Sequence, residues 1–292
     1  MAKKYIIEPE YHGYKVKDYL KEVLGYSSRS MRKIDVFLNG KKVKVDKKVR
    51  KLNRLIIKEH NKGTNIKPIE MELNIVYEDE NLIIIDKEPH LVVHPTKKKV
   101  DKTLAHGIVY YMREQTGEIT IPRFFNRLDM NTSGLIVVTK NGHTQAFLQN
   151  KELATVKKYY KTIVKGIVEE DEFIIEDPIG RVGDSLKREI LSVEDGGQLA
   201  KTSVKVLKRM NELNLTLLEV ELFTGRTHQI RVHLSSLGYP ILGDELYGGE
   251  VEGVKRQLLH AYKLVFTNPE TKLEEVVEAE LPKDMREIID NQ

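Results

Sequence analysis

Charge is distributed unevenly along this chain of 292 residues, and the imbalance divides it into two parts. Residues 1–67 carry 19 Lys and Arg against 7 Asp and Glu, a net charge of +12, whereas the remainder carries 29 against 37, a net charge of −8. A small basic module joined to a larger, mildly acidic body is expected when one part binds a polyanion. Lysines that merely aid solubility are the competing interpretation, which so large a local excess disfavours.

The overall composition is that of an ordinary soluble protein, with 40% apolar and 32% charged residues. No apolar run approaches the roughly 18 residues that a membrane-spanning helix needs. The first ten residues, MAKKYIIEPE, have lysines with no apolar stretch behind them, so they do not form a signal peptide. The absence of cysteine excludes disulfides and thiolate metal sites. We therefore expect a cytoplasmic protein that does not contact membranes.

The basic part has the pattern of two short helices followed by a hairpin. Apolar residues recur at helical spacing over residues 16–24, and Ser27 or Ser28 can cap the next helix. Asn39-Gly40 between apolar strands is a strong signal for a two-residue hairpin turn. Basic residues around these elements predict a compact cationic face made of Arg29, Arg32, Lys33, Lys41, Lys42 and Lys44.

The rest of the chain predicts an α+β body. Residues 61–72 are polar and predict a linker between the module, 1–60, and the body, 73–292. Two or three strands are expected between residues 73 and 95, with a turn at 78–81. Helices are expected over 103–113 and 142–150, and strands over 156–168, 202–208 and 215–223. Strands mixed with few, unevenly placed helices favour a largely antiparallel mixed sheet over a doubly wound one.

One segment of the body, FFNRLDMNTSGLIVVTKNG at residues 124–142, contains a single carboxylate, Asp129. Short turn-forming residues follow it at 131–134, and an apolar strand follows them. An Asp before such a turn often only caps backbone amides. The interpretation as a functional acid depends on which side chains other segments of the chain bring to it.

A second polar motif, TGRTHQIRVHLSSLG, predicts a helix with Thr227 as its N-cap and Gly238 at its end. Arg231 lies one turn into this helix and could reach a buried carboxylate, keeping that acid ionised and oriented. A surface arginine on a solvated helix face is the alternative. His228 and His233 point about 140° apart around a helix, which excludes a metal-binding pair.

The strand VKKYYKTIVKG places Tyr160 on the face opposite Lys161 and Lys165. Such a tyrosine is more often a core residue, although flat aromatic rings also stack on nucleobases. The chain has no phosphate-binding loop, no His-x-x-x-His and no Gly-x-Ser-x-Gly. Nucleotide hydrolysis, metal hydrolysis and serine esterase chemistry are therefore disfavoured, and we expect no cofactor and no metal.

Taken together, these motifs resemble those of the RluA/RluD-type pseudouridine synthases. NRLDMNTSGLIVVTKN is similar to the family's His-Arg-Leu-Asp-x-x-Thr-Ser-Gly signature, KYYKTIVKG to its Lys-x-Tyr element, and TGRTHQIRVHLSSLGYPILGDELYG to its third motif. IIIDKEPHLVVHPT and LLHAYKLVFTNPETKLE are similar to its opening and closing strand pairs. The resemblance covers residues 75–285 and implies the pseudouridine synthase fold.

The resemblance also implies a reaction and the residues that perform it. A uridine within RNA would be isomerised to pseudouridine without redox change and without a cofactor. Asp129 would be the essential carboxylate, Arg231 its ion-pair partner and Tyr160 the ring against the target uracil. Arg127 would fill the gap that an extruded base leaves in the RNA. We expect further RNA contacts from Asn126, Arg226 and His228.

Three positions of the body depart from the family pattern: Asn126 stands where histidine is usual, His90 where glycine is usual, and Thr162 where alanine is usual. The order of elements in the basic module resembles the alpha-L RNA-binding motif, first known from a small-subunit ribosomal protein. Its usual Gly-Asp is replaced here by Leu52-Asn53.

RNA is the partner that the sequence predicts for a monomeric enzyme. Large-subunit ribosomal RNA is the expected target, because members with an alpha-L module usually act there, and transfer RNA is the alternative. A non-catalytic RNA-binding or assembly protein remains a second class of function. A carboxylate-based sugar hydrolase is a third, and it would need two acids near each other.

Overall fold

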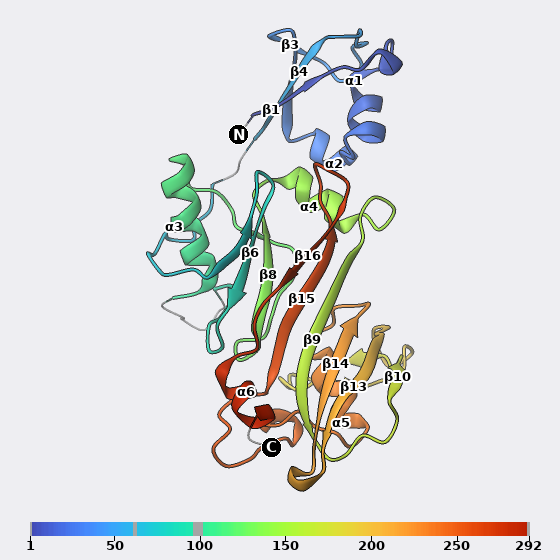
Figure 1. Cartoon of the computed structure of the whole chain (residues 1–292). Coiled ribbons are helices and arrows are strands. Elements are labelled where there is room, and N and C mark those ends of the chain that lie inside the picture. Colours follow the sequence, from blue (N-terminus) through green and yellow to red (C-terminus); the bar gives the residue numbers. More distant parts are fainter. Residues whose placement is uncertain (1, 61–62, 96–101, 291–292) are drawn as a thin grey trace.

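The computed structural model describes residues 2–60, 63–95 and 102–290 (Figure 1). At the N-terminal end a four-stranded antiparallel sheet has the order β1-β4-β2-β3. Its strands are β1 (Ala2–Ile6), β2 (Ile34–Leu38), β3 (Lys41–Val43) and β4 (Arg54–Glu59). The helical part comprises η1 (Pro9–Tyr11), α1 (Val16–Asp18), a π-helical turn η2 (Tyr19–Val23) and α2 (Ser28–Met31).

Local signals in this module are confirmed by its structure. Ser27 caps α2, because its hydroxyl accepts a hydrogen bond from the backbone N–H of Ser30 at 3.1 Å. Asn39 and Gly40 have φ values of 49° and 82°, as the tight turn between β2 and β3 requires. Leu52 has φ 65° at the position where the motif usually has glycine. The turn therefore forms in this chain with a side chain in the left-handed region.

The body is built on a second sheet whose main path has the order β10-β13-β14-β9-β15-β8-β6-β5. Along the chain these strands are β5 (Ile75–Glu78), β6 (Leu82–Lys87), β8 (Ser133–Thr139), β9 (Val156–Lys165), β10 (Glu172–Ile175), β13 (Thr202–Met210), β14 (Leu215–Leu222) and β15 (Leu259–Thr267). β7 (Arg123–Phe124) pairs with β8, and β16 (Glu274–Glu278) with β15, while β11 (Ile179–Gly180) and β12 (Glu189–Ile190) form a small separate ladder.

Helices cover both faces of the β6–β8 half of this sheet, which explains why β8 is buried at every position. α3 (Leu104–Thr116) packs against the face that contains Ile83 and Ile136. α4 (Gly142–Gln149) packs against the opposite face, which contains Leu82 and Leu135. Three further helical segments are α5 (Gln229–Ser236), η4 (Glu245–Tyr247) and α6 (Lys283–Asp290), and η3 (Asn211–Leu213) joins β13 to β14.

β15 and β8 pair in parallel, whereas the other strand pairs among the described residues are antiparallel. The contact is short and pairs His260 with Ser133 and Ala261 with Gly134. Gly134 has φ 110°, and a Cβ there would lie 2.3 Å from the carbonyl oxygen of Ala261. Only glycine allows the strands to approach this closely, so the Thr-Ser-Gly turn is required by the joint between the two halves of the sheet.

The N-terminal module contacts the body at α2 and α4 (Figure 1). The ring of Tyr26 stacks on that of His143 with centroids 4.0 Å apart and 14° between the planes. The ammonium of Lys3 donates to the Asn81 side-chain oxygen at 2.7 Å. A cleft of about 830 Å³ lies beside this contact, between the first sheet and α3.

Most of the predicted elements of the body are confirmed, with one correction. Residues 73–95 contain two strands, the lower of the two numbers expected, because residues 88–95 form no strand. Thr227 is not the N-cap of α5, because the helix begins one residue later, after His228 at φ 58°. Gly238, with φ 85°, does follow the end of that helix. In the part of the chain described here, no helix has both the length and the apolarity to span a bilayer.

Candidate active site

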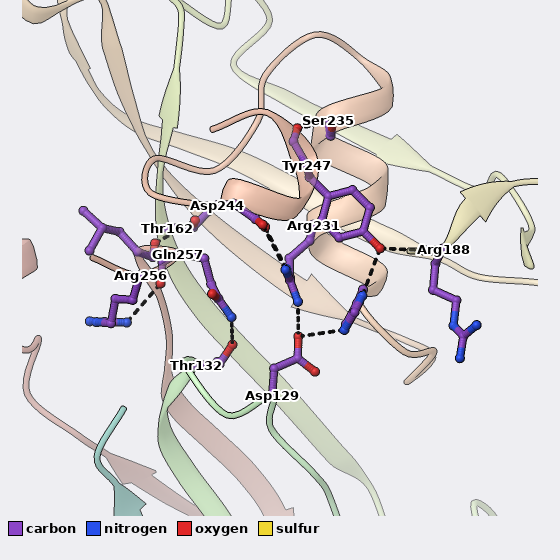
Figure 2. Close-up of polar contacts among 12 residues, drawn as sticks. Asp129, Thr132, Thr162, Arg188, Arg231, Ser235, Asp244, Tyr247, Arg256 and Gln257 are labelled. Atoms are coloured by element: carbon purple, nitrogen blue, oxygen red, sulfur yellow. Dashed lines mark hydrogen bonds and ion pairs between the residues drawn. The ribbon is translucent and has the colours of Figure 1, made fainter. Parts of the chain in front are cut away.

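Asp129 lies in the loop before β8, beside the first turn of α5 (Figure 2). Its Oδ2 accepts a hydrogen bond from an Arg231 terminal nitrogen at 2.8 Å. Arg231 also donates through Nε and its other terminal nitrogen to both oxygens of Asp244, at 2.7 and 2.9 Å. The predicted pairing of Asp129 with Arg231, a hundred residues apart in sequence, is thus present in the structure, and Asp244 is a third member that the sequence reading did not single out.

Exposure differs sharply across these three side chains. Arg231 is 8% exposed and Asp244 1%, whereas Asp129 is 29% exposed. Burial acts against the charge of Arg231, but hydrogen bonds and attraction from Asp244 and Asp129 outweigh it and raise the arginine pKa. The ring of Tyr247 lies 4.9 Å from the guanidinium carbon and covers it. The result is a rigid buried ion pair with one carboxylate at its open end.

His228 also lies close to the carboxylate of Asp129. Its Nε2 lies 3.7 Å from Asp129 Oδ2, and its Nδ1 lies 2.9 Å from the Tyr247 hydroxyl. That hydroxyl accepts the backbone N–H of Arg188 at 2.8 Å. Burial lowers the pKa of His228, and the neighbouring carboxylates only partly oppose this. The structure thus places His228, predicted as an RNA contact, within the acid site.

Tyr160 is 5% exposed and belongs to the main core cluster of the body, together with Leu128 and Ile230. Burial and the nearby charge of Asp129 both raise the pKa of its hydroxyl, so the ring stays neutral at physiological pH. The side chain projects from β9, the strand that pairs with β15, on the same face as Thr162 and Val164. It is therefore a buried aromatic wall near Asp129, as the strand pattern predicts.

The loop that contains Asp129 is held by side chains from two other segments, residues 87–90 and 256–260. The Lys87 ammonium, 1% exposed, donates to the carbonyl oxygens of Glu88 at 2.7 Å and Met130 at 3.0 Å. Burial, with Arg256 nearby, lowers the Lys87 pKa to about 7. Arg256 donates to the Asn131 carbonyl oxygen at 3.2 Å and forms a two-point ion pair with Asp284.

Further contacts hold the rest of this loop. The Gln257 amide donates to Thr132 Oγ1 at 3.3 Å, and His260 Nδ1 lies 2.9 Å from Ser133 Oγ. His90 Nδ1 lies 3.0 Å from the side-chain oxygen of Asn131. His90 itself has φ 63°, in the left-handed region that the family's usual glycine adopts easily. The loop is thus fixed at its backbone and at its side chains before any substrate binds.

Asn126, predicted as an RNA contact, binds the backbone of β8 in the structure. Its side-chain nitrogen donates to the Leu135 carbonyl oxygen at 3.0 Å, and its oxygen accepts from the Val137 N–H at 2.8 Å. Both ends of the amide therefore extend the hydrogen bonding of β8, and an RNA contact by Asn126 stays a prediction. The amide positions the segment that leads to Asp129.

The remaining predicted RNA contacts lie on the surface. Arg127 is exposed two residues before Asp129. Arg226 is also exposed, and it donates to the Leu199 carbonyl oxygen at 2.9 Å and the Gln198 side chain at 3.1 Å. In the N-terminal module Arg32, Lys33 and Lys41 are exposed, and Lys42 pairs with Asp35 at 2.7 Å. The side chain of Arg29 lies outside the described part.

Several site residues were missed at the level of sequence: Lys87, Asp244, Tyr247 and Arg256. Asp244 and Tyr247 belong to GDELYG, the end of the third motif. The sequence resemblance therefore included both residues, although it did not single out either as a site residue. Lys87 follows an apolar strand, where a lysine is an unexpected residue to bury. No group of three potential metal ligands converges among residues 2–60, 63–95 and 102–290.

Comparison with known proteins shows the family of the chain. Residues 81–236 match the model of the RNA pseudouridylate synthase family. An RNA pseudouridine synthase of Aquifex aeolicus is 36% identical over 268 residues, which cover 87% of this chain and 84% of that protein. The ribosomal large subunit pseudouridine synthase D of Pseudomonas aeruginosa is 37% identical over 233 residues, covering 74% and 70%.

Among solved structures, human RNA pseudouridylate synthase domain containing 1 matches with a TM-score of 0.58 and 26% identity, covering 75% of this chain and 87% of that one. The fold predicted from the sequence motifs is thereby confirmed. The family match, the similar relatives and the shared fold lead to one conclusion: this chain belongs to the RNA pseudouridylate synthase family, in its RluA/RluD-type branch, and is an isomerase that modifies RNA.

Proposed function

We propose that this enzyme converts uridine to pseudouridine in large-subunit ribosomal RNA, with Asp129 as the catalytic carboxylate. The observation that carries the role of Asp129 is its position in the ion-pair network. Arg231 and Asp244 are almost completely buried, while Asp129 alone is open to a substrate at 29% exposure. The contacts of its carboxylate with Arg231 and His228 both involve Oδ2, and Figure 2 shows Oδ1 pointing away from Arg231.

The chemistry requires no cofactor. The bond between uracil N1 and the ribose C1′ breaks, the base turns, and a bond from C5 to C1′ forms. The C5 hydrogen leaves as a proton and N1 gains one, so atoms and electrons balance without an oxidant. An acid paired with Arg231 is suited to act on the sugar or the base, and the buried ring of Tyr160 offers a flat surface against which uracil can turn.

Two parts of the surface supply the proposed RNA contacts, one beside the acid site and one on the N-terminal module. A uridine inside a helix must be extruded, which costs about a few kcal/mol, and we propose that Arg127, which is exposed, enters the gap. We further propose that residues 1–60 act as an alpha-L RNA-binding module, 61–72 as a linker and 73–292 as the catalytic domain. The exposed cations Arg32, Lys33 and Lys41 support this division.

Ribosomal RNA is preferred over transfer RNA as the target for two reasons. The Pseudomonas relative is named as a large-subunit ribosomal RNA enzyme, and the basic module offers a second contact for a large structured RNA. A non-catalytic binding protein would not need the ordered acid site. A sugar hydrolase would need a second acid in reach of substrate, whereas both oxygens of the buried Asp244 bind Arg231.

Mapping pseudouridine in cellular RNA tests this proposal. We expect one or more sites in large-subunit ribosomal RNA to disappear when the gene is deleted, and to return with the wild-type gene but not with Asp129→Asn. If the lost pseudouridines lie only in transfer RNA, then transfer RNA is the target and the proposal of ribosomal RNA is wrong. Restoration by Asp129→Asn would overturn the role of the carboxylate.

A further inference from the structure

A chain of polar contacts connects the backbone near β12 to the carboxylate of Asp129. The Arg188 N–H donates to the Tyr247 hydroxyl oxygen at 2.8 Å, and that oxygen lies 2.9 Å from His228 Nδ1. The other ring nitrogen of His228 lies 3.7 Å from Asp129 Oδ2. Because each group in this chain has a limited set of donors and acceptors, the contacts determine where the protons lie.

At the tyrosine end, the peptide N–H of Arg188 can only donate, so the Tyr247 oxygen accepts it. The hydroxyl has one hydrogen of its own, and Tyr247 is only 5% exposed. A buried hydroxyl that donates to nothing loses its hydration without compensation. The nitrogen of His228 at 2.9 Å is a suitable acceptor. Donation to Nδ1 leaves that nitrogen without a hydrogen and places the ring proton on Nε2.

At the aspartate end, an ionised carboxylate can only accept hydrogen bonds. If Nε2 carried no proton, its lone pair would face Asp129 Oδ2 and the two would repel. If Nε2 carries the proton, its N–H faces an acceptor. The 3.7 Å separation is longer than a formed hydrogen bond, and such contacts in a free enzyme often shorten when substrate binds. Both ends of the ring therefore select the same neutral tautomer.

The charged groups around His228 leave it neutral near pH 7. Asp129 faces it from the loop before β8, Arg231 from α5, Asp244 and Tyr247 from the η4 region, and Arg188 from the start of β12. Burial and the two arginines lower the histidine pKa, whereas the two carboxylates raise it, and the net shift is downward. A dipole rather than a second positive charge therefore faces the acid.

We infer that His228 is a positioning residue for Asp129, held by the Tyr247 hydroxyl as the neutral Nε2–H tautomer. It directs an N–H at Oδ2 and so helps to leave Oδ1 turned toward the substrate. The charge of Arg231 is already shared with Asp244, so a neutral donor orients Asp129 without making the carboxylate less reactive. The functional part of this inference rests on the proposed role of Asp129.

The tautomer is measured directly by long-range ¹H–¹⁵N correlation on the full chain labelled with ¹⁵N-histidine. The chain has nine histidines, so the His228 signals are identified as those lost in His228→Gln. We expect the Nε2–H pattern at about pH 7 in the wild-type protein and a tautomer mixture in Tyr247→Phe. An Nδ1–H pattern or a doubly protonated ring in the wild-type protein would overturn the inference.

Single-turnover kinetics on in vitro transcribed large-subunit ribosomal RNA test the functional part. Tyr247→Phe keeps the ring over Arg231 and removes only the hydroxyl. We expect about a tenfold lower rate with unchanged RNA affinity, in keeping with the loss of one hydrogen bond. The loss of rate in Tyr247→Phe should be greater at about pH 6 than at about pH 8. At the lower pH the Nδ1 of His228, no longer bound to a hydroxyl, can take up a proton.

The matched control is Tyr111→Phe. Tyr111 lies on α3, and its hydroxyl donates to Glu78 on β5 at 2.6 Å. A purely structural role for the Tyr247 hydroxyl would lower the rate equally at every pH, and that result or an unchanged rate would refute the positioning role. Failure of the wild-type protein to form pseudouridine would refute the proposed function instead, while the tautomer measurement would still decide the geometry.

Discussion

The acid site and the cationic face of the N-terminal module both depend on charged side chains, but they hold charge in opposite ways. In the acid site Arg231 is 8% exposed and binds two carboxylates. On the module Arg32, Lys33 and Lys41 are exposed. Buried charges are weakly screened and fix one geometry, whereas exposed charges are screened by salt and attract a polyanion without a fixed geometry. The buried charges therefore fix the geometry of the acid site, whereas the exposed charges of the module are proposed to raise the affinity for RNA.

The largest expected effect comes from Asp129→Asn, which separates these two functions. We expect the rate of pseudouridine formation to fall on the order of 10⁴-fold, because the acid is removed, while RNA affinity stays within about twofold. Single-turnover assays and filter binding measure both. Arg231 keeps its two bonds to Asp244, so the protein should remain folded. A rate near that of the wild type would show that the acid is not catalytic.

Asp244→Asn tests the buried half of the same network. Arg231 would lose a charged partner in a site that is almost sealed from water, so we expect a loss of about 3 kcal/mol in unfolding free energy. The rate should fall about 100-fold as the arginine shifts. Asp284→Asn is the control, because it also removes a two-point partner of a buried arginine, but its side chain is 45% exposed. Equal losses in the two variants would mean that burial is not the deciding factor.

Acid should weaken the body through a histidine under the Asp129 loop. Burial, followed by the charge of Arg256, lowers the pKa of His260 from 6.5 to about 4. Between these values the unfolded chain binds a proton that the folded chain does not, so stability is complete above about pH 6.5 and falls as pH drops toward 4. The expected loss is about 3 kcal/mol, measured by urea unfolding across this range. His260→Gln should reduce the slope, and an unchanged slope would argue against this cause.

Neutralising the exposed cations tests the other side of the comparison. The triple variant Arg32→Gln, Lys33→Gln and Lys41→Gln should lower the slope of log affinity against log salt by about 2 to 3, since each phosphate contact releases counterions. The rate at saturating RNA should not change. A body triple with Lys151, Lys157 and Lys283 changed to Gln is the control for net charge. Identical salt slopes in the two triple variants would show that the module does not contact the RNA.

The smallest effect concerns two residues in left-handed conformations, one in each region. Leu52 has φ 65° and His90 has φ 63°. Replacing either by glycine relieves strain and should raise unfolding free energy by about 0.5 kcal/mol or more. Only His90→Gly also removes a contact with Asn131 in the Asp129 loop, so it alone should slow the reaction, by a few-fold. Slower catalysis in Leu52→Gly would show that the N-terminal module also affects the acid site.

Local patterns predicted much of this molecule because their causes are local. The Asn39-Gly40 hairpin, the Ser27 cap and the alternating strands β9, β13 and β14 depend on neighbours within a few residues. The start of α5 was predicted one residue early, since Thr227 is a good capping residue by itself. His228 takes that position instead, and its ring contacts Tyr247 and Asp129. A tertiary contact there overrode a local preference.

The sequence alone determined which segments fold, that the chain has a basic and an acidic part, and that Asp129, Arg231 and Tyr160 stand in motifs of a uridine isomerase. Only the tertiary structure decided how those residues are held. Asp244 shares the charge of Arg231, Lys87 and Arg256 hold the Asp129 loop, and Asn126 binds the backbone of β8. These roles depend on burial and on contacts between distant segments, which linear spacing does not contain.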